Sequence, residues 1–142
     1  MIRRACVVTL LALPMTFGMA RADDVKDLEG TWIPSDATNA GEKMAEDFIK
    51  SVTLKLNGTK YDATIGEIKE TGKFTLDSKK KPKTMDITPT DGPNKDKLML
   101  AIYELDGDTL KVCYTFDGKT RPTEFKSTPE NKWFLVTYKR KK

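Results

Sequence analysis

The segment LMLAIYELDGDTLKVCYTF, residues 98 to 116, contains the two strongest strand signals in the chain. In its second half Leu110, Val112 and Tyr114 occupy alternate positions, the period at which side chains of a β-strand share one face. The tripeptide Asp106-Gly107-Asp108 separates the two runs and is typical of a tight turn. The stretch therefore predicts a pair of antiparallel strands.

The same alternation recurs from Gly30 onward, in short runs separated by Gly, Pro, Asn and Asp. The dipeptide Asn57-Gly58 between two of these runs is a strong hairpin signal, because both residues tolerate positive φ. Helical spacing of apolar residues is confined to a single turn at 25–28 and a short amphipathic helix at 41–50. The expected strands span residues 31–36, 51–56, 60–65, 73–76, 84–88, 98–105, 109–116 and 133–139.

Eight short strands that pair in chain order would expose two rows of unpaired backbone groups if the sheet stayed open. Closing the sheet removes both edges, and eight strands enclose an interior just wide enough to fill with side chains or to hold one small ligand. We therefore expect an all-β fold, a small eight-stranded antiparallel up-and-down β-barrel with one short helix after the first strand. A two-sheet sandwich is the alternative.

Residues 1–22 have the order of a secretory signal peptide: two arginines, an apolar stretch and the small-residue site Ala20-Arg21-Ala22. The apolar stretch is too short for a transmembrane helix, which needs about 20 apolar residues. We expect cleavage before Asp23, which leaves one barrel domain at residues 23–142. That domain is expected to be periplasmic or secreted, without stable membrane insertion. An uncleaved membrane anchor is the alternative.

Removal of the leader changes the charge and cysteine counts. The chain has 25 basic and 21 acidic residues, and three of the arginines lie in the leader, which leaves 22 against 21. A domain this close to neutral is not expected to bind nucleic acid. Cys113 is the one cysteine left, so no intramolecular disulfide is expected, and we interpret it as an inert, at least partly buried thiol.

The chain contains no histidine. The commonest zinc ligand and the usual general base near neutral pH are therefore missing. A carboxylate pair such as Glu104 and Glu124 would be the remaining acid/base candidate, and we predict that the protein is not an enzyme. We expect no metal, no cofactor and a monomeric state.

The tripeptide Gly30-Thr31-Trp32, at the start of the first expected strand, resembles a motif of the lipocalins and their relatives. In those proteins the tryptophan plugs one end of the barrel and packs against an arginine from the last strand. The resemblance implies that Trp32 does the same here, with Arg140 as its partner and Lys139 as the second candidate.

Longer motifs resemble the lipocalin-like domain family of exported planctomycete bacterial proteins. They are LEGTW at 28–32, KPKTMDIT at 81–88, DGPNK at 91–95, IYELDGDTLKVCY at 102–114 and RPTEFK at 121–126. Together they extend over nearly the whole chain after residue 22. The resemblance implies a small exported β-barrel. Because that family is largely uncharacterised, it carries over no catalytic or binding residue.

Our first hypothesis for function is a binding module whose barrel holds a small apolar or amphipathic molecule. Apolar side chains of the expected strands would line the barrel, and the hydroxyls of Tyr103 and Tyr114 would either meet the ligand or reach water from the core. The candidate lining residues are Val52, Leu54, Ile87, Leu100, Ile102, Tyr103, Val112 and Tyr114.

The alternative is a protein-interaction or inhibitor module that uses loops at one end of the barrel. The segments 91–96 and 118–131 would form the contact surface. Arg121 and Glu124 in the second segment are candidates for polar groups at the barrel mouth, or for a structural ion pair that fixes the loop.

Overall fold

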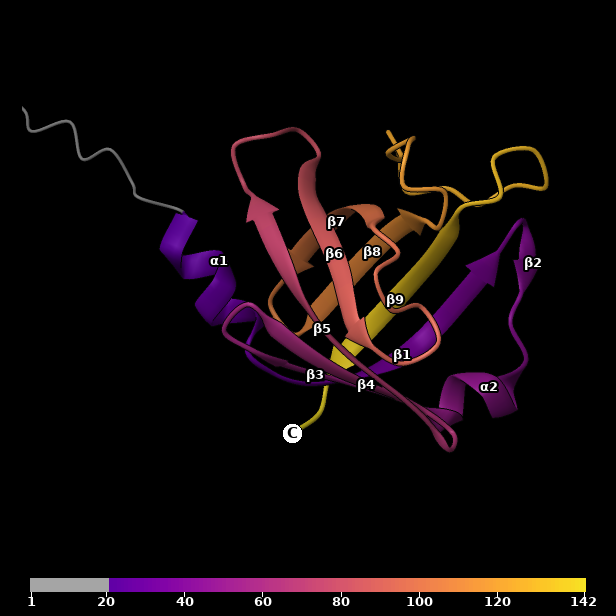
Figure 1. Ribbon diagram of the computed structural model, residues 1–142, viewed down its shortest axis with the longest axis horizontal. Helices are drawn as coiled ribbons and strands as arrows, with labels where there is room; N and C mark the ends of the chain where they lie inside the picture. The colour runs from indigo at the N-terminus through magenta and orange to yellow at the C-terminus, as the bar shows by residue number, and fades with distance from the viewer. Residues whose placement is uncertain (1–20) are drawn as a thin grey trace, which may run out of the picture.

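The computed structural model describes residues 21–142, which form nine strands and two short helices (Figure 1). The helices are α1 (Arg21–Leu28) and α2 (Glu46–Ser51). The strands are β1 (Gly30–Asn39), β2 (Glu42–Lys43), β3 (Val52–Asn57), β4 (Lys60–Ile65), β5 (Ile68–Asp77), β6 (Lys83–Asp91), β7 (Met99–Asp106), β8 (Thr109–Thr115) and β9 (Phe134–Arg140).

The sheet is closed. Strands β1 and β3 to β9 pair in chain order, every pair is antiparallel, and β9 returns to pair with β1 along its whole length. The two-residue strand β2 pairs only with the end of β1 and is not part of the ring. The predicted eight-stranded antiparallel barrel is therefore confirmed, and the sandwich alternative is wrong.

Most elements match their expected ranges to within a few residues, although β1 continues to Asn39 instead of 36 and β6 to Asp91 instead of 88. Strand β5 and the second helix differ more. Strand β5 begins at Ile68 instead of 73. The alternating pattern does not predict this earlier start, because Glu70 and Gly72 occupy positions where alternation would place apolar residues. The helix after the first strand is shorter than expected, since residues 42–43 form β2 and α2 begins only at Glu46.

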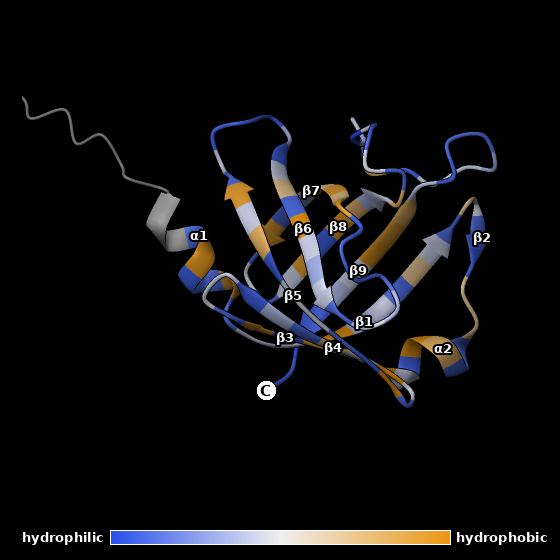
Figure 2. Ribbon diagram, viewed as in Figure 1, coloured by the Kyte–Doolittle hydropathy of each residue, from blue (hydrophilic) through white to orange (hydrophobic). Residues whose placement is uncertain are grey.

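Alternation of apolar and polar residues along the strands produces the core (Figure 2). Inward side chains of neighbouring strands stand opposite one another, as in the register that joins Met85, Ala101 and Tyr114 across β6, β7 and β8. These three belong to one cluster of buried and partly buried residues that forms the core of the barrel.

Trp32 closes one end of the barrel and is fully buried. Its indole Nε1 donates to the Leu28 carbonyl at 2.8 Å, and the Arg140 guanidinium lies over the ring, 4.3 Å from its centroid. Arg140 also donates to the carbonyls of Glu29 at 2.6 Å and Asp27 at 2.5 Å. Arg140 is thus the partner that the resemblance implies for Trp32.

Gly30 makes that arrangement possible. Its φ is +135°, which L side chains rarely adopt, and a Cβ on it would lie 3.0 Å from a guanidinium nitrogen of Arg140. The three residues of the expected structural motif, Gly30, Trp32 and Arg140, therefore meet at one end of the barrel.

Helix α1 covers the same end and is fixed there by Asp24. The Asp24 Oδ2 accepts hydrogen bonds from the Tyr103 hydroxyl at 2.7 Å and the Lys83 Nζ at 2.9 Å. Burial opposes the charge of Asp24, but these hydrogen bonds and the Lys83 charge lower its pKa below the usual value. The helix begins at Arg21 and so spans the predicted cleavage junction. Residues 1–20 of the predicted signal peptide lie outside the described residues.

The segment between β8 and β9 folds back over the outer face of the barrel. Arg121 donates to the Ala101 carbonyl at 2.8 Å and forms an ion pair with Asp86. The Cys113 Sγ lies 3.7 Å from the Lys126 carbonyl, and the thiol is fully buried. Ile102 and Cys113, on the outer faces of β7 and β8, are therefore also shielded from water.

No helix within residues 21–142 combines the length and the apolar character needed to cross a membrane.

Candidate functional site

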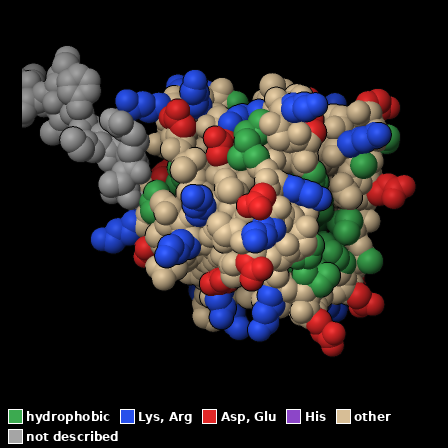
Figure 3. Space-filling model, viewed as in Figure 1, with side chains coloured by type: hydrophobic (Ala, Val, Ile, Leu, Met, Phe, Trp, Pro, Cys, Tyr) green, Lys and Arg blue, Asp and Glu red, His purple; other side chains and the backbone are tan. Residues whose placement is uncertain are grey.

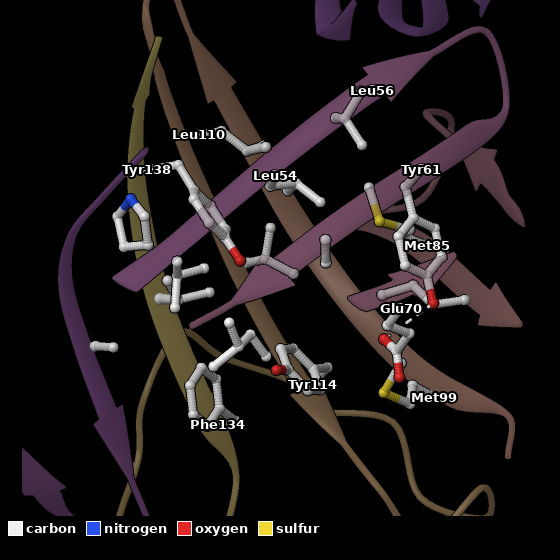
Figure 4. A pocket seen from close by; sticks show the side chains of 18 of the residues that line it. Leu54, Leu56, Tyr61, Glu70, Met85, Met99, Leu110, Tyr114, Phe134 and Tyr138 are labelled. Atoms are coloured by element: carbon white, nitrogen blue, oxygen red, sulfur yellow. Dashed lines mark hydrogen bonds between the residues drawn. The ribbon is translucent and has the colours of Figure 1, made fainter. Parts of the chain in front are cut away.

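An apolar cavity of about 130 Å³ lies inside the barrel, at the end opposite Trp32. One wall is aromatic. Tyr114 of β8 and Phe134 of β9 have ring centroids 5.1 Å apart, and Tyr138 lies four residues after Phe134 on the same face of β9. Met85 and Met99 contribute flexible thioethers to the opposite wall (Figure 4). The cavity is therefore a small hydrophobic pocket bordered by aromatic and polarisable side chains.

The open end of the cavity has an apolar rim. Phe48 of α2 lines the cavity there. The three large hydrophobic side chains that are most exposed within the described residues are Ile68, Leu98 and Phe116, which lie at strand ends on this side of the barrel. The Phe116 ring packs edge-on against Tyr114 at 5.3 Å, so the rim is continuous with the cavity wall. Figure 3 shows apolar side chains gathered near α2 on this side of the surface.

A buried carboxylate stands in the cavity wall. Glu70 is only 9% exposed, and its two oxygens accept hydrogen bonds from the Tyr61 hydroxyl at 3.2 Å and the Asn94 amide at 2.9 Å. Asn94 reaches it from the connection between β6 and β7, whereas Tyr61 is on the neighbouring strand β4. Glu70 is therefore held in position from two sides.

Gly72 gives the Tyr61 ring its path to Glu70. Tyr61 and Gly72 stand opposite each other in the β4–β5 pair, and a Cβ on Gly72 would lie 2.6 Å from the Tyr61 ring. The same Cβ would lie 2.6 Å from the Thr88 carbonyl of β6. A glycine is therefore required at position 72 for the Tyr61 hydroxyl to reach Glu70.

Two further hydroxyls border the cavity. Within residues 21–142, no protein group forms a hydrogen bond with the hydroxyl of Tyr114 or Tyr138. Neither hydroxyl oxygen is completely buried. Both oxygens are therefore accessible to a small molecule in the cavity, and Figure 4 shows that of Tyr138 turned toward its centre. Burial raises the pKa of both tyrosines, so they are neutral phenols at physiological pH.

The structure brings part of the predicted lining together. Val52, Leu54, Ile87, Val112 and Tyr114 line the cavity. Leu100 and Ile102 do not, because the inward positions of β7 are those of Met99, Ala101 and Tyr103. Tyr103 is inward, but its hydroxyl is bonded to Asp24 at the closed end, away from the cavity.

Leu100 and Ile102 are apolar for another reason. The segment after β8 covers the outer face of β7, where Ile102 is 1% exposed and stands beside Cys113 in the register. Around Ile102 both faces of this strand are therefore shielded from water, and an apolar run cannot show which of them is inward.

Arg121 and Glu124 do not form a polar pair at the barrel mouth. Arg121 lies on the outer wall, where it holds Asp86 and backbone carbonyls of β6 and β7. Glu124 is exposed and has no ion-pair partner among residues 21–142. Arg121 and Glu124 therefore form neither the expected mouth pair nor the structural ion pair that was its alternative, and Arg121 pairs with Asp86 instead.

Glu70 and Tyr61 are the polar site residues that the sequence reasoning missed. Glu70 lies at an even spacing of four and six residues before Phe74 and Leu76, whose apolar side chains face the core. Extending that parity past Gly72 would have placed its carboxylate in the barrel. The glycine and the charge concealed the continuation of the strand.

The rest of the described surface has fewer features of a binding site than the barrel cavity. A hollow of about 330 Å³ lies outside the barrel between the β5–β6 connection and Phe125, and it is bordered by Lys80, Lys81 and Lys83. Among residues 21–142, no group of three or more acidic or cysteine side chains is arranged to hold a metal ion. The barrel cavity is thus the strongest candidate for a functional site, because it combines apolar walls with placed polar groups.

Comparison with protein-family models, curated proteins and solved structures finds no match to this chain.

Proposed function

We propose that this protein is an exported, non-enzymatic binding module whose barrel holds one small, mainly apolar molecule. The observation that supports the proposal is the cavity itself: an apolar interior with accessible phenol hydroxyls and a fixed carboxylate, open at a single rim. Apolar walls provide affinity and a few placed polar groups provide orientation, the usual composition of a ligand pocket.

The volume limits the ligand. Typical sites for drug-sized ligands have about 300–1,000 Å³, and the cavity here has about 130 Å³. A dry cavity of about 150 Å³ in another protein accepts benzene. The enclosed part of the ligand is therefore a short chain or a single ring, and a longer tail would extend past Ile68, Leu98 and Phe116 at the rim.

A binding role fits the side chains better than catalysis does. Glu70 is the one carboxyl group in the cavity wall, and both of its oxygens are already engaged by neutral donors. General acid/base catalysis needs a second group placed to exchange protons with the reacting atoms. The other titratable groups of the wall are tyrosines whose pKa is raised by burial, so they stay protonated near neutral pH and are poor proton donors.

A homologous series of straight-chain alcohols tests the proposal. Each methylene that enters the cavity should strengthen binding by about 0.8 kcal/mol, roughly fourfold. The gain should fall once the cavity is full and added carbons reach the rim. Binding is read from the methyl NMR signals of Met85 and Met99, which line the cavity, against that of Met44, which does not.

A pair of variants at adjacent positions of β4 supplies the control. Ala63 faces the cavity, and Thr64 points to the opposite face of the same strand. Ala63→Leu should move the plateau of the series to a shorter alcohol, and Thr64→Leu should leave it unchanged. If no alcohol shifts the methyl signals of Met85 and Met99 selectively, the barrel is not a carrier.

A protein-interaction module remains the second candidate because the rim is apolar and exposed: Phe116 is 49% and Ile68 is 50% exposed. The segments 91–96 and 118–131 are tied to the barrel, the first through Asn94 to Glu70 and the second through Arg121 to the Ala101 carbonyl. A photo-crosslinking residue at position 116 would join a partner that docks on the rim. The same residue at the exposed position 104, on the outer face of β7, should not capture that partner.

A further inference from the structure

The carboxylate of Glu70 has no cationic partner in the part of the chain that the structure describes. None of the ion pairs among residues 21–142 involves it. Lys69 and Lys73, the two lysines nearest to Glu70 in the sequence, are both exposed and belong to no ion pair. Glu70 is nevertheless more than nine-tenths buried and forms part of the cavity wall.

Burying the Glu70 carboxylate without a cationic partner costs folding free energy. A buried charge needs a partner of opposite sign, and hydrogen bonds from neutral donors compensate only part of the lost hydration. Asn94 and Tyr61 supply one donor to each oxygen of Glu70. Each carboxylate oxygen can accept more than one hydrogen bond, so acceptor capacity remains on the cavity side.

The remaining wall offers no competing positive charge. The residues that line the cavity include no lysine and no arginine. The tyrosine hydroxyls add acceptor oxygens, and the rings of Tyr114, Phe134 and Tyr138 present π-faces, which attract cations within about 6 Å. The interior therefore combines a single negative charge with groups that favour a positive one.

We propose that the ligand is a small primary amine, whose ammonium group pairs with Glu70 while its hydrocarbon part occupies the apolar cavity. This inference rests on the proposed binding function and specifies the chemical class of the ligand. It assigns Glu70 as the residue that determines specificity, with Tyr61 and Asn94 as the residues that position it.

Three probes of equal length and different charge test the assignment: n-pentylammonium, n-pentanol and pentanoate. Each is titrated into the protein while the methyl signals of Met85, Met99 and Met44 are followed. An ammonium–carboxylate contact in a shielded site should make pentylammonium bind about 10- to 100-fold more tightly than pentanol. Pentanoate should bind most weakly, because its charge repels that of Glu70.

The variant Glu70→Gln removes the charge and keeps the shape. It should reduce the affinity for pentylammonium by about 10- to 100-fold and leave that for pentanol nearly unchanged. Glu104→Gln is the matched control, because Glu104 is exposed on the outer face of β7 and outside the cavity. It should alter neither affinity. If Glu70→Gln does not fold, the order of affinity of the three probes for the unaltered protein tests the assignment alone.

The outcomes separate the two proposals. If pentanol binds in the cavity as tightly as pentylammonium, the amine assignment is overturned and the binding function stands. The same holds if Glu70→Gln folds and keeps its preference for the ammonium probe. If none of the three probes shifts the cavity methyls selectively, both proposals fail.

Discussion

Asp24 shows how much of this small barrel depends on single side chains. It joins α1 to β6 through Lys83 and to β7 through Tyr103, although it is only the fourth of the residues that the structure describes. Its lowered pKa means that the folded state holds the charged form more strongly than the unfolded chain does. The contact therefore contributes stability above the unfolded pKa of about 3.9, and that contribution is lost as pH falls through the lower folded value.

Replacing Asp24 by Asn should reveal that dependence. At pH 7 the variant is expected to lose about 1–2 kcal/mol of unfolding free energy, because the charge-assisted hydrogen bonds from Lys83 and Tyr103 are weakened and Lys83 is partly exposed. The difference from wild type should shrink below about pH 4. Urea unfolding between pH 7 and pH 2 measures it. Asp27→Asn, on the exposed side of the same helix, is the control, and a pH-independent loss would contradict the electrostatic account.

At the scale of elements, the segment between β8 and β9 acts as an outer cover held by Arg121. The guanidinium contacts Asp86 and the carbonyls of Met85 and Ala101, so it links the cover to two strands at once. Beneath it, burial raises the pKa of the Cys113 thiol, which keeps the thiol protonated and unreactive.

Loss of the Arg121 contacts should expose Cys113. We expect Arg121→Met to speed alkylation of this thiol by roughly tenfold, equivalent to ~1.4 kcal/mol less free energy for local opening. Peptide mapping after timed iodoacetamide labelling identifies the modified cysteine. Lys119→Met removes an exposed charge from the same segment and should not change the rate. Equal rates in all three proteins would show that Arg121 does not hold the cover.

Strand positions were predictable where alternation was undisturbed. The hairpin of β7 and β8 and the turn at Asn57-Gly58 appear as expected, because turn residues and period-two patterns are local properties. The first half of β5 was missed because Glu70 and Gly72 replace apolar residues there. Their presence depends on the Tyr61 ring and on the cavity, which are tertiary features.

The candidate site was predictable only in part for a related reason. The lining residues on β3 and β8 follow from strict alternation. On β7 the outward residue Ile102 is also buried, and the cover over it comes from a loop whose path has no periodic signal. Asn94 reaches Glu70 from another irregular segment, so the polar part of the site could not be assembled from strand patterns.

For the molecule as a whole, closure of the barrel depends on the contact between its first and last strands. Trp32 and Arg140 are directly paired in the β1–β9 register, and the guanidinium also holds the end of α1 through backbone carbonyls. One side chain therefore joins the plug, the first strand and the last strand.

Arg140→Lys keeps the charge and removes the planar, multiply donating group. We expect a loss of about 1–3 kcal/mol in unfolding free energy, from the stacking on Trp32 and from carbonyl contacts that one ammonium group cannot reproduce. Urea unfolding followed by tryptophan fluorescence measures it. Lys141→Arg, at the exposed neighbouring position, should have little effect. Unchanged stability in Arg140→Lys would mean that charge alone secures the closed end.

Closure through β9 also governs when the chain can fold. The hydrogen bond from Arg140 to the Glu29 carbonyl spans 111 residues of sequence, and β1 to β8 leave the ribosome before β9 does. Contacts this distant form late, because the entropy of closing the loop is lost before any of them is made. During synthesis β1 has no partner for its second edge until β9 has emerged. A delay of this kind would suit the export that we propose, because a translocation channel accepts a polypeptide that has not yet folded.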